Sequence, residues 1–531
     1  MKKLVSILLA LAMIFAMTTT AFAEEITTLT VADGRTFTGY QLLYLTTSEK
    51  TGDQHTTHEG AHTDACYNYA YTVNPKYLPD LQDEVFANGG NYLWTESGKP
   101  ANSDGITEDQ ILKYLSNQKT ETTDTVRQVA ENIYKRIKDM DPDTEELKAT
   151  TTIAQGYWMF VDVTGLEGEN AANSLVVLDT KGQSELTITP KTALPTVEKK
   201  VKDIEDSEDA NITDNAWHDT ADHDIGDSIP FKLTGTLPSN AQYYSSYKMV
   251  FHDTLSVGLT CDAGSVKVYM YETKHKADVD TDMNDYAQDV TEKFLPTVTT
   301  ADDGTTLTVG CDNVFAIDGV TKDTAFVVYY TATLNDKAVI GAVGNPNEVY
   351  LEFSNNPYGD TTGKTETDEV SVFTYQLNIN KIDGFNAPLV GAGFTLYKKD
   401  SGGNYVAIGE ELKGDTMTTF IWTGLDDGDY KLQETTVPSG YNGMDEILFS
   451  ISAEHSETDG EPQLLSLDGG LMGTGTVETG AITKDIVNNT GTVLPETGAK
   501  GTAMLITMGA MLVTVAAVFM VTRKKMSIYE D

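Results

Sequence analysis

The chain contains 531 residues, and its acidic residues outnumber its basic residues by 80 to 37, giving a formal net charge of −43. Binding to nucleic acid or to an anionic membrane requires basic surface, so this charge argues against both as the main function. Without its two terminal segments the chain has about 470 residues, enough for about three domains.

The first 23 residues have the three parts of a secretory signal peptide. Met1-Lys2-Lys3 is a charged start, residues 4–17 are apolar, and Ala21-Phe22-Ala23 is a small-residue cleavage site. We therefore expect the chain to be exported and cut near Ala23.

The three cysteines are too few for a disulfide framework in an exported protein of this length. Cys261 and Cys311 fall within one predicted domain and could pair, which would leave Cys66 unpaired. Small buried thiols are an equally supported alternative. The domains therefore need either well-packed cores or another kind of covalent link.

Residues 24–192 are predicted to form a mixed α+β domain. Apolar residues at spacings of three and four predict helices at 106–118 and 122–140. Segments rich in β-branched and aromatic residues predict strands at 28–31, 39–45, 157–163, 174–178 and 185–189.

A polar stretch of this domain contains the H-E-x-x-H pattern of zinc metalloproteases, at His58, Glu59 and His62. That pattern binds zinc when both histidines lie on one face of a helix. Residues 51–64 are rich in Gly, Thr and Asp and have no apolar periodicity, so a solvated loop is favoured over adventitious metal binding. A protease is the least supported reading, and we predict neither a metal site nor a cofactor.

Residues 193–366 are predicted to form an all-β domain. Turns rich in Gly, Pro and Asp separate its strand-like segments, a pattern typical of a sandwich. These segments are 229–233, 248–252, 266–271, 305–310, 324–334 and 348–354.

Three strands of this domain each place one polar residue on an otherwise apolar face, because side chains alternate between the two faces of a strand. Lys199 shares its face with residues 197 and 201, Asp253 with residues 247, 249 and 251, and Asn355 with residues 349, 351 and 353. An isolated charge is too costly to bury. We therefore expect Lys199, Asp253 and Asn355 to meet in the core.

Residues 371–493 are predicted to form a smaller β domain with a similar set of polar residues. Lys381 shares a strand face with two apolar residues, at 377 and 379, and Glu434 alternates with Tyr430 and Leu432. Near the end of the domain Asn488 shares a strand face with Ile486, and Asn489 does not.

The final segment, residues 494–531, begins with the pentapeptide Leu494, Pro495, Glu496, Thr497 and Gly498. The apolar run that follows, 499–521, is long enough to cross a bilayer. Basic residues at 523–525 should stay on the cytoplasmic side of that membrane.

This order of pentapeptide, apolar run and basic tail resembles the cell-wall sorting signal of Gram-positive surface proteins. In that family a sortase, a membrane-bound cysteine transpeptidase, cleaves between the residues corresponding to Thr497 and Gly498 and joins the threonine carbonyl to an amine. The resemblance implies a protein on the extracellular surface, attached to peptidoglycan, whose C-terminal segment is only transiently in the membrane. An ordinary membrane anchor would not explain the pentapeptide.

The domains themselves resemble those of SpaA-type shaft pilins. Residues 251–255 and 355–357 are similar to the fimbrial isopeptide-formation domain of pilins. Residues 430–441 match every fixed position of the E-box of Cna protein B-type domains, Y-x-L-x-E-T-x-x-P-x-G-Y. The resemblance implies a mainly β fold, with tandem immunoglobulin-like (Cna-type) β-sandwiches after the mixed N-terminal domain.

The same resemblance implies an intramolecular isopeptide bond between a lysine and an asparagine in each sandwich. Lys199 would join Asn355 with Asp253 as the promoting acid, and Lys381 would join Asn488 with Glu434 as that acid. Burial lowers the pKa of a lysine and raises that of a carboxylic acid, so the amine can be nucleophilic while the acid relays protons. The alternative is that each lysine lays its aliphatic part on the core while its amine reaches solvent.

Residues 189–191, Thr-Pro-Lys, partly match the Tyr-Pro-Lys-type motif at the end of the first domain of shaft pilins. The lysine of that motif is the amine that receives the next subunit, which makes Lys191 a candidate. Because the tyrosine is absent, an ordinary exposed lysine between domains is equally supported.

Together these features predict a structural subunit of a covalently polymerised pilus, with autocatalytic bond formation as its only chemistry. Its expected partners are a sortase, neighbouring pilin subunits and peptidoglycan. A monomeric wall-anchored adhesin or an ancillary pilin, with a host surface ligand, is the alternative. A wall-anchored metalloprotease is a remote one.

Overall fold

The structure is a computed structural model, and the residues that it describes are 26–49, 67–89, 93, 99–118, 123–204, 217–281, 286–456 and 462–491. The signal peptide, the His58–His62 motif, Cys66 and the C-terminal segment from 494 lie outside the described residues. No helix within those ranges is long and apolar enough to cross a membrane.

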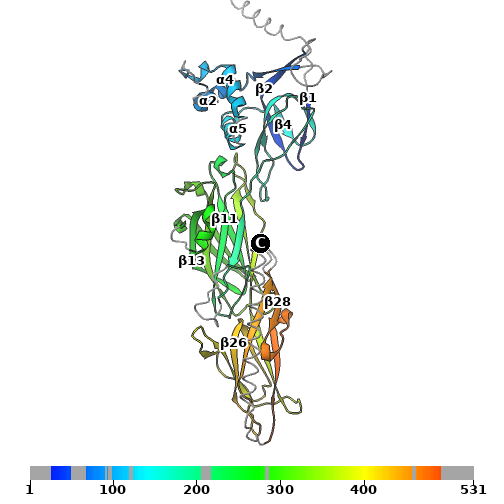
Figure 1. Ribbon diagram of the computed structural model, residues 1–531, viewed down its shortest axis with the longest axis vertical. Helices are drawn as coiled ribbons and strands as arrows, with labels where there is room; N and C mark the ends of the chain where they lie inside the picture. The colour runs from blue at the N-terminus through cyan, green and yellow to red at the C-terminus, as the bar shows by residue number, and fades with distance from the viewer. Residues whose placement is uncertain are drawn as a thin grey trace, which may run out of the picture.

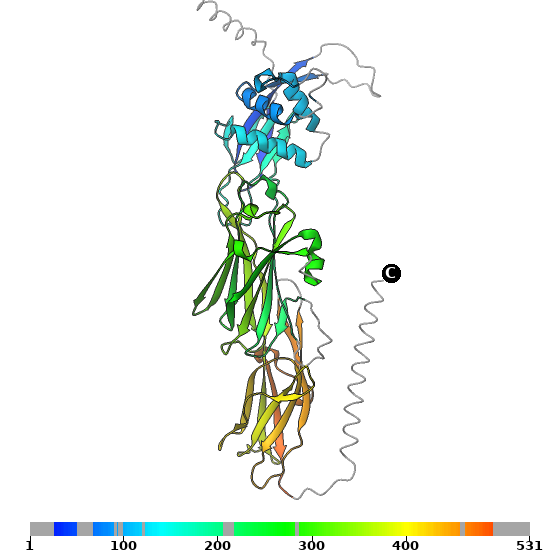
Figure 2. The ribbon, with the colours of Figure 1, turned by 90° about the vertical axis from the view of Figure 1, so that its left-hand side faces the viewer.

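Three units follow one another along the longest axis of the molecule, in the order of the sequence (Figures 1 and 2). Strands dominate each unit, and longer helices occur mainly in the first, so the predicted mainly β fold is confirmed. Each unit has its own buried apolar core.

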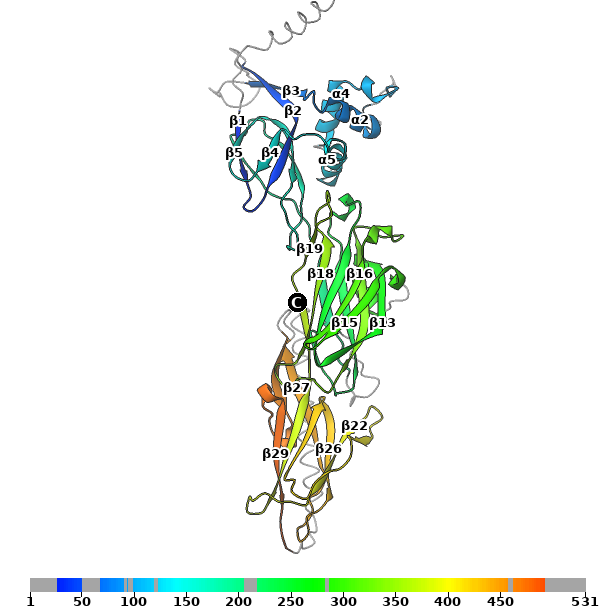
Figure 3. The ribbon, with the colours of Figure 1, turned by 180° about the vertical axis from the view of Figure 1, so that it is seen from behind.

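In its described residues, the first unit combines two small sheets with three α-helices, which gather on one side of it (Figure 3). The helices are α2 (Leu78–Asn88), α4 (Glu108–Asn117) and α5 (Thr123–Ile137). One sheet has the order β5-β1-β8, and the other has the order β3-β2-β6-β7 with β4 beside β2. The strands are β1 (Ile26–Val31), β2 (Phe37–Glu49), β3 (Tyr67–Val73), β4 (Thr144–Leu147), β5 (Thr151–Ala154), β6 (Gly156–Asp162), β7 (Leu175–Asp179) and β8 (Glu185–Ile188).

Both predicted helices are present as α4 and α5, whereas α2 and β3 were not predicted. Helix α4 begins with a capping box, in which Thr107 and Gln110 satisfy each other's backbone N–H groups. In α5 the apolar residues at 129, 133 and 137 are buried, as their spacing predicts.

The second unit is a sandwich of two sheets. One has the order β14-β13-β17-β11-β9, and the other β10-β20-β18-β12-β16-β15 with β19 beside β18. The strands are β9 (Val197–Val201), β10 (Thr220–Asp222), β11 (Ser228–Thr236), β12 (Met249–Ser256), β13 (Leu259–Glu272), β14 (Gln288–Asp289), β15 (Leu295–Ala301), β16 (Gly304–Cys311), β17 (Thr324–Leu334), β18 (Asn345–Ser354), β19 (Thr362–Lys364) and β20 (Asp368–Phe373). A short helix, α6 (Lys276–Thr281), follows β13.

Strand β20 places the end of this sandwich later than the predicted boundary at residue 366. It pairs in parallel with β10 and antiparallel with β18, so it is part of the second unit's sheet. Residues 371–373, which the sequence analysis assigned to the third domain, therefore belong to the second.

The third unit is a smaller sandwich. A three-stranded sheet, β25-β21-β29, faces a sheet with the order β23-β22-β26-β27-β28 and β24 beside β22. The strands are β21 (Tyr375–Asp383), β22 (Gly393–Lys399), β23 (Tyr405–Ala407), β24 (Leu412–Lys413), β25 (Thr419–Leu425), β26 (Gly428–Thr436), β27 (Ile447–Ser456), β28 (Gln463–Asp468) and β29 (Ala481–Asn488).

The two cysteines in the described residues are free thiols, so the Cys261–Cys311 disulfide considered above is absent. Both are half-buried at the edge of the second unit's core. Burial raises the pKa of the Cys261 thiol to about 12. This supports the alternative that these cysteines pack as small apolar side chains.

The second and third units are in close contact at Gly424, whose φ is +75°. Its carbonyl accepts a hydrogen bond from the N–H of Ile225. A Cβ at position 424 would lie 2.4 Å from Ile225 Cδ1 and 2.8 Å from Ile225 Cβ, so the clash involves the base of that side chain as well as its tip.

We expect Gly424→Ala to lower the free energy of unfolding of the third unit by about 2–4 kcal/mol, because strain at positive φ adds to overpacking. Gly403→Ala is the matched control, since φ there is +81° but no atom lies within 4 Å of the added Cβ. It should cost about 1 kcal/mol, from the backbone strain alone. Urea unfolding of both variants measures the difference, and equal losses would contradict the close interdomain packing.

Candidate functional site

A lysine amine is fully buried in the core of the second unit. Lys199 lies on β9, at the edge of the five-stranded sheet, and its Nζ donates to Asp253 Oδ1 on β12 of the facing sheet. The same amine is 3.2 Å from the hydroxyl of Tyr330 on β17. Both Lys199 and Asp253 have no exposed surface.

Tyr330 connects this pair to an asparagine that the sequence analysis did not single out. Its hydroxyl donates to Asp253 Oδ2 and accepts a 2.7 Å hydrogen bond from Asn347 Nδ2. Asn347 lies on β18, is fully buried, and has no hydrogen-bond partner for its Oδ1 among the described residues. The buried cluster therefore contains a lysine, a carboxyl group, a phenol and a primary amide.

Asn355, the predicted partner of Lys199, is not part of this cluster. Asp253 pairs with Val349 in the β12–β18 ladder, so Asn355 lies six residues farther along, which is about 20 Å at the rise of a strand. Asn347 is two residues from Val349 in the other direction and on the same face. The prediction of Asn355 beside Lys199 was wrong because both asparagines share that face, and only the register between strands distinguishes them.

Asn355 instead takes part in the contact between the first and second units. Its side-chain Nδ2 donates to Leu166 O at 2.6 Å, and its backbone carbonyl oxygen accepts from the N–H of Asn173 at 2.8 Å. Close by, the hydroxyl of Tyr358 donates to Glu131 of α5 at 2.8 Å. The loop after β18 thus attaches the sandwich to the helical unit.

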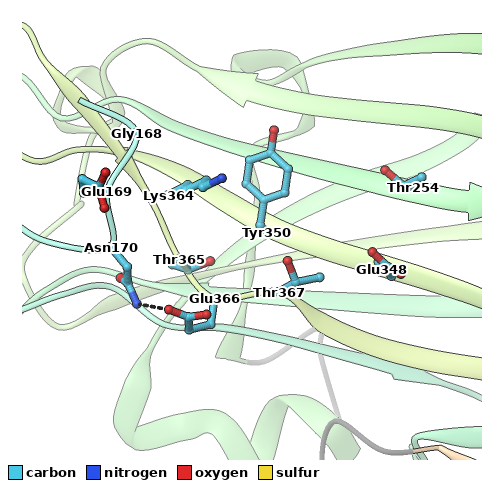
Figure 4. A pocket seen from close by; sticks show the side chains of 10 residues that line it. All are labelled: Gly168, Glu169, Asn170, Thr254, Glu348, Tyr350, Lys364, Thr365, Glu366 and Thr367. Atoms are coloured by element: carbon cyan, nitrogen blue, oxygen red, sulfur yellow. Dashed lines mark hydrogen bonds between the residues drawn. The ribbon is translucent and has the colours of Figure 1, made fainter. Parts of the chain in front are cut away.

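The same interface contains a polar cavity of about 450 Å³, between residues 168–170 of the first unit and strands β18 and β19 (Figure 4). Asn170 reaches across it to donate to Glu366 Oε1 at 3.2 Å. The lysine cluster does not line this cavity.

The third unit contains a second buried lysine amine. Lys381 on β21 has no exposed surface, and its Nζ is 3.7 Å from Glu434 Oε1 on β26 of the facing sheet. Asn488 on β29 is also buried, and its Nδ2 donates to the same Glu434 oxygen at 2.7 Å. The structure therefore brings Lys381, Glu434 and Asn488 together, whereas Asn489 is exposed.

Strand order explains how distant residues meet at this site. Strands β21 and β29 are parallel neighbours, with Lys381 opposite Ile486 and Asp383 opposite Asn488. Lys381 Nζ donates to Ile486 O at 3.2 Å. The Asn488 Oδ1 atom has no hydrogen-bond partner among the described residues, as at Asn347.

Burial changes the protonation of these groups in the direction that amide chemistry requires. Desolvation lowers the pKa of Lys199 and outweighs the opposing effect of Asp253. Desolvation also raises the pKa of Asp253. In the third unit, burial lowers the pKa of Lys381 against the opposing charge of Glu434. Both shifts move the lysine amine toward its uncharged form.

Lys191 lies in the opposite environment. It is exposed, outside any helix or strand, in the segment between β8 of the first unit and β9 of the second. An exposed amine is accessible to another protein, which the amines of Lys199 and Lys381 are not.

Comparison with known proteins identifies two parts of the chain. Residues 375–462 match the SpaA family, described as a prealbumin-like fold domain. The third unit is a SpaA-type prealbumin-like domain. Residues 486–527 match the LPXTG cell wall anchor motif, which indicates a protein attached to the wall on the surface of a Gram-positive bacterium.

A similar protein is the trypsin-resistant surface T6 protein of Streptococcus pyogenes serotype M6, which is 27% identical over 270 residues. The match covers 48% of this chain and 44% of that protein, so the chain spans less than half of its relative's length.

Two solved pilin structures are also similar. The T6 backbone pilin of S. pyogenes has a TM-score of 0.46 at 17% identity, covering 89% of this chain and all of that one. The major pilin SpaA of Corynebacterium diphtheriae has a TM-score of 0.40 at 12% identity, covering 87% of this chain and 99% of that one.

The difference in environment among the three lysines gives a direct test. In the folded protein, we expect an amine-reactive acylating reagent to modify Lys191 rapidly and to leave Lys199 and Lys381 unmodified, because neither buried amine is accessible. Peptide mass mapping after brief labelling measures this, with the exposed Lys413 as a control. Labelling of Lys199 or Lys381 at the rate of Lys413 would contradict their burial.

Proposed function

We propose that this chain is the shaft subunit of a covalently polymerised surface pilus, joined to its neighbours and to peptidoglycan by a sortase. The SpaA-type domain, the LPXTG anchor and the similarity to the T6 protein support this function. The observation that carries the proposal is the buried grouping of lysine, acid and asparagine, repeated in two successive sandwiches.

Each grouping would form an intramolecular isopeptide bond: Lys199 with Asn347, and Lys381 with Asn488. The neutral amine nitrogen attacks Cγ of the asparagine, the new N–C bond forms, and the C–NH2 bond breaks. The lysine nitrogen gives up a proton, and the departing amide nitrogen leaves as ammonia. No oxidant, metal or external cofactor is needed.

Asp253 and Glu434 would act as the proton-relaying acids of this reaction. A protonated acid polarises the asparagine carbonyl by donating a hydrogen bond to it. The carbonyl oxygens of Asn347 and Asn488 have no other partner among the described residues. Rotation of the Asn488 amide about its Cβ–Cγ bond would exchange its two polar atoms and direct that oxygen at Glu434.

The bond in the second unit would connect its two sheets, since β9 and β18 lie in different ones. The bond in the third unit would connect neighbouring strands of one sheet, near the two ends of the domain sequence. Closing a loop of the length between Lys199 and Asn347 is worth about 5 kcal/mol in the chain-entropy treatment developed for disulfides. Tension along the chain would then bypass the strands enclosed by each bond.

The intact mass of the purified mature chain tests the two bonds. We expect it to be lower than the sequence mass by two molecules of ammonia. Asp253→Ala and Glu434→Ala should each abolish one of the two losses, because the sites lie in separate units. A mass equal to that of the sequence would contradict both bonds.

Asn347→Ala and Asn355→Ala form a matched pair for the second unit. Removing Asn347 removes the electrophile, so one ammonia loss should disappear. Removing Asn355 takes away the contact with Leu166 and should leave both losses in place. The reverse pattern would restore Asn355 as the bonded residue.

Polymerisation is proposed to use Lys191 as the acceptor for Thr497 of the next subunit. Pro190 fixes its own φ and favours an extended Thr189, so the lysine lies on a stiff segment between two units. A head-to-tail contact of this kind propagates into an open filament if it does not close into a ring.

We expect Lys191→Ala to abolish the ladder of high-mass, boiling-resistant species in cell-wall extracts while the monomer still reaches the wall. Lys191→Arg should do the same, because a guanidinium stays protonated and does not accept an acyl group. Lys181→Ala, which removes another exposed lysine of the first unit, is the control and should leave the ladder intact. A ladder that survives both Lys191 variants would rule out this lysine as the acceptor, and a single wall-linked species in the parent strain would favour an adhesin.

A further inference from the structure

Carboxylates from two units converge where the second and third units meet. Asp222 ends β10 of the second unit, and Asp426 and Asp427 lie in the turn between β25 and β26 of the third. Each offers an oxygen that lies within 4.8 Å of those from the other two. Asp222 is 2% exposed and Asp426 is 1% exposed, whereas Asp427 is half-buried.

Lys398 of the third unit shares its amine between two carboxylates at this junction. Lys398 Nζ is 2.6 Å from Asp224 and 3.2 Å from Asp426. The Oδ2 atom of Asp222 is buried and has no hydrogen-bond partner among the described residues. A buried oxygen without a donor, beside further carboxylates, is the environment in which a bound cation is most favourable.

We propose that Asp222, Asp426 and Asp427 bind a calcium ion that links the second and third units. Calcium takes oxygen ligands at 2.3–2.6 Å, so two oxygens on one ion can be up to about 5 Å apart, and the observed separations fit. Calcium also tolerates irregular geometry and completes its coordination with water or backbone carbonyls. Extracellular modules bind it at about 10⁻⁴–10⁻³ M.

A neighbouring group, His223, Asp227 and Asp426, is the less suitable site. Its imidazole already has partners, because His223 Nε2 is 3.1 Å from Lys202 O and Nδ1 is 3.7 Å from Asp227. The Asp222 group contains only oxygen ligands, which favours calcium over a transition metal.

The ion would reinforce a junction that hydrogen bonds already define. The N–H of Asp426 donates to Asp224 Oδ1 at 2.9 Å, and that of Ile225 donates to Gly424 O at 3.0 Å. Because Asp222 and the Asp426–Asp427 turn belong to different units, bound calcium would restrict bending between them. This inference does not depend on polymerisation.

Calorimetric titration of calcium chloride into the purified mature chain, after dialysis against EDTA, tests the site. We expect one calcium ion per chain and a rise in melting temperature on binding. Asp222→Asn and Asp426→Asn should each weaken the affinity at least tenfold and abolish that rise. Asp415→Asn, which alters an exposed carboxylate of the third unit, should change neither.

Melting in EDTA shows whether the variants fold. Each amide removes one of several repelling buried charges, so neither variant should melt below the parent without calcium. Absence of saturable calcium binding, or binding that both variants retain, would overturn the proposal. Zinc binding that is lost in His223→Gln, without calcium binding, would assign the ion to the neighbouring group and would equally overturn it.

Discussion

The removal of a lysine amine from water is the constraint on which both sandwiches depend. Lys199 and Lys381 have no exposed surface, and an ammonium ion in such a place is very costly unless it is paired. Each amine lies beside a buried acid, and burial lowers the pKa of both lysines. Both sites thus make the ammonium form of the lysine less favourable than it is in water. An amide bond between lysine and asparagine would remove the amine permanently.

The architecture of each sandwich positions these groups in a different way. In the second unit, Lys199 and Tyr330 come from one sheet, and Asp253 and Asn347 come from the other. The four side chains therefore meet in the core between the two sheets. In the third unit, Lys381 and Asn488 lie on paired parallel strands, and only Glu434 comes from the facing sheet. The same grouping of lysine, acid and asparagine is therefore built on two different strand arrangements.

The sequence predicted most of these residues because side-chain alternation in a strand is local. Lys199, Asp253, Lys381 and Glu434 were identified because each is a polar residue on a strand face that is otherwise apolar. The same alternation favoured Asn488 over Asn489. Alternation could not choose between Asn347 on β18 and Asn355 just beyond its end, because an even number of residues separates them. That choice depends on the pairing of β18 with β12, which one sequence does not specify. Tyr330 was missed because a buried tyrosine has the pattern of an ordinary core residue.

The boundary between the sandwiches was misplaced for a related reason. Strand β20 follows a polar segment and is almost continuous with β21, so its sequence reads as the start of the next domain. Its parallel partner, β10, lies much earlier in the sequence, so the pairing that places β20 in the second unit is not a local feature. The acidic group at the junction was also not predicted, since Asp222 is distant in sequence from Asp426 and Asp427 and meets them only because β10 ends beside the β25–β26 turn.

The central claim is that buried lysine, acid and asparagine groups join the strands of each sandwich covalently. Tandem mass spectrometry of an exhaustive proteolytic digest of the mature chain tests it most directly. The account predicts branched peptides that join Lys199 to Asn347 and Lys381 to Asn488, each lighter by one ammonia than its two parts. Recovery of all four residues in linear peptides only, or a branch from Lys199 to Asn355, would contradict it.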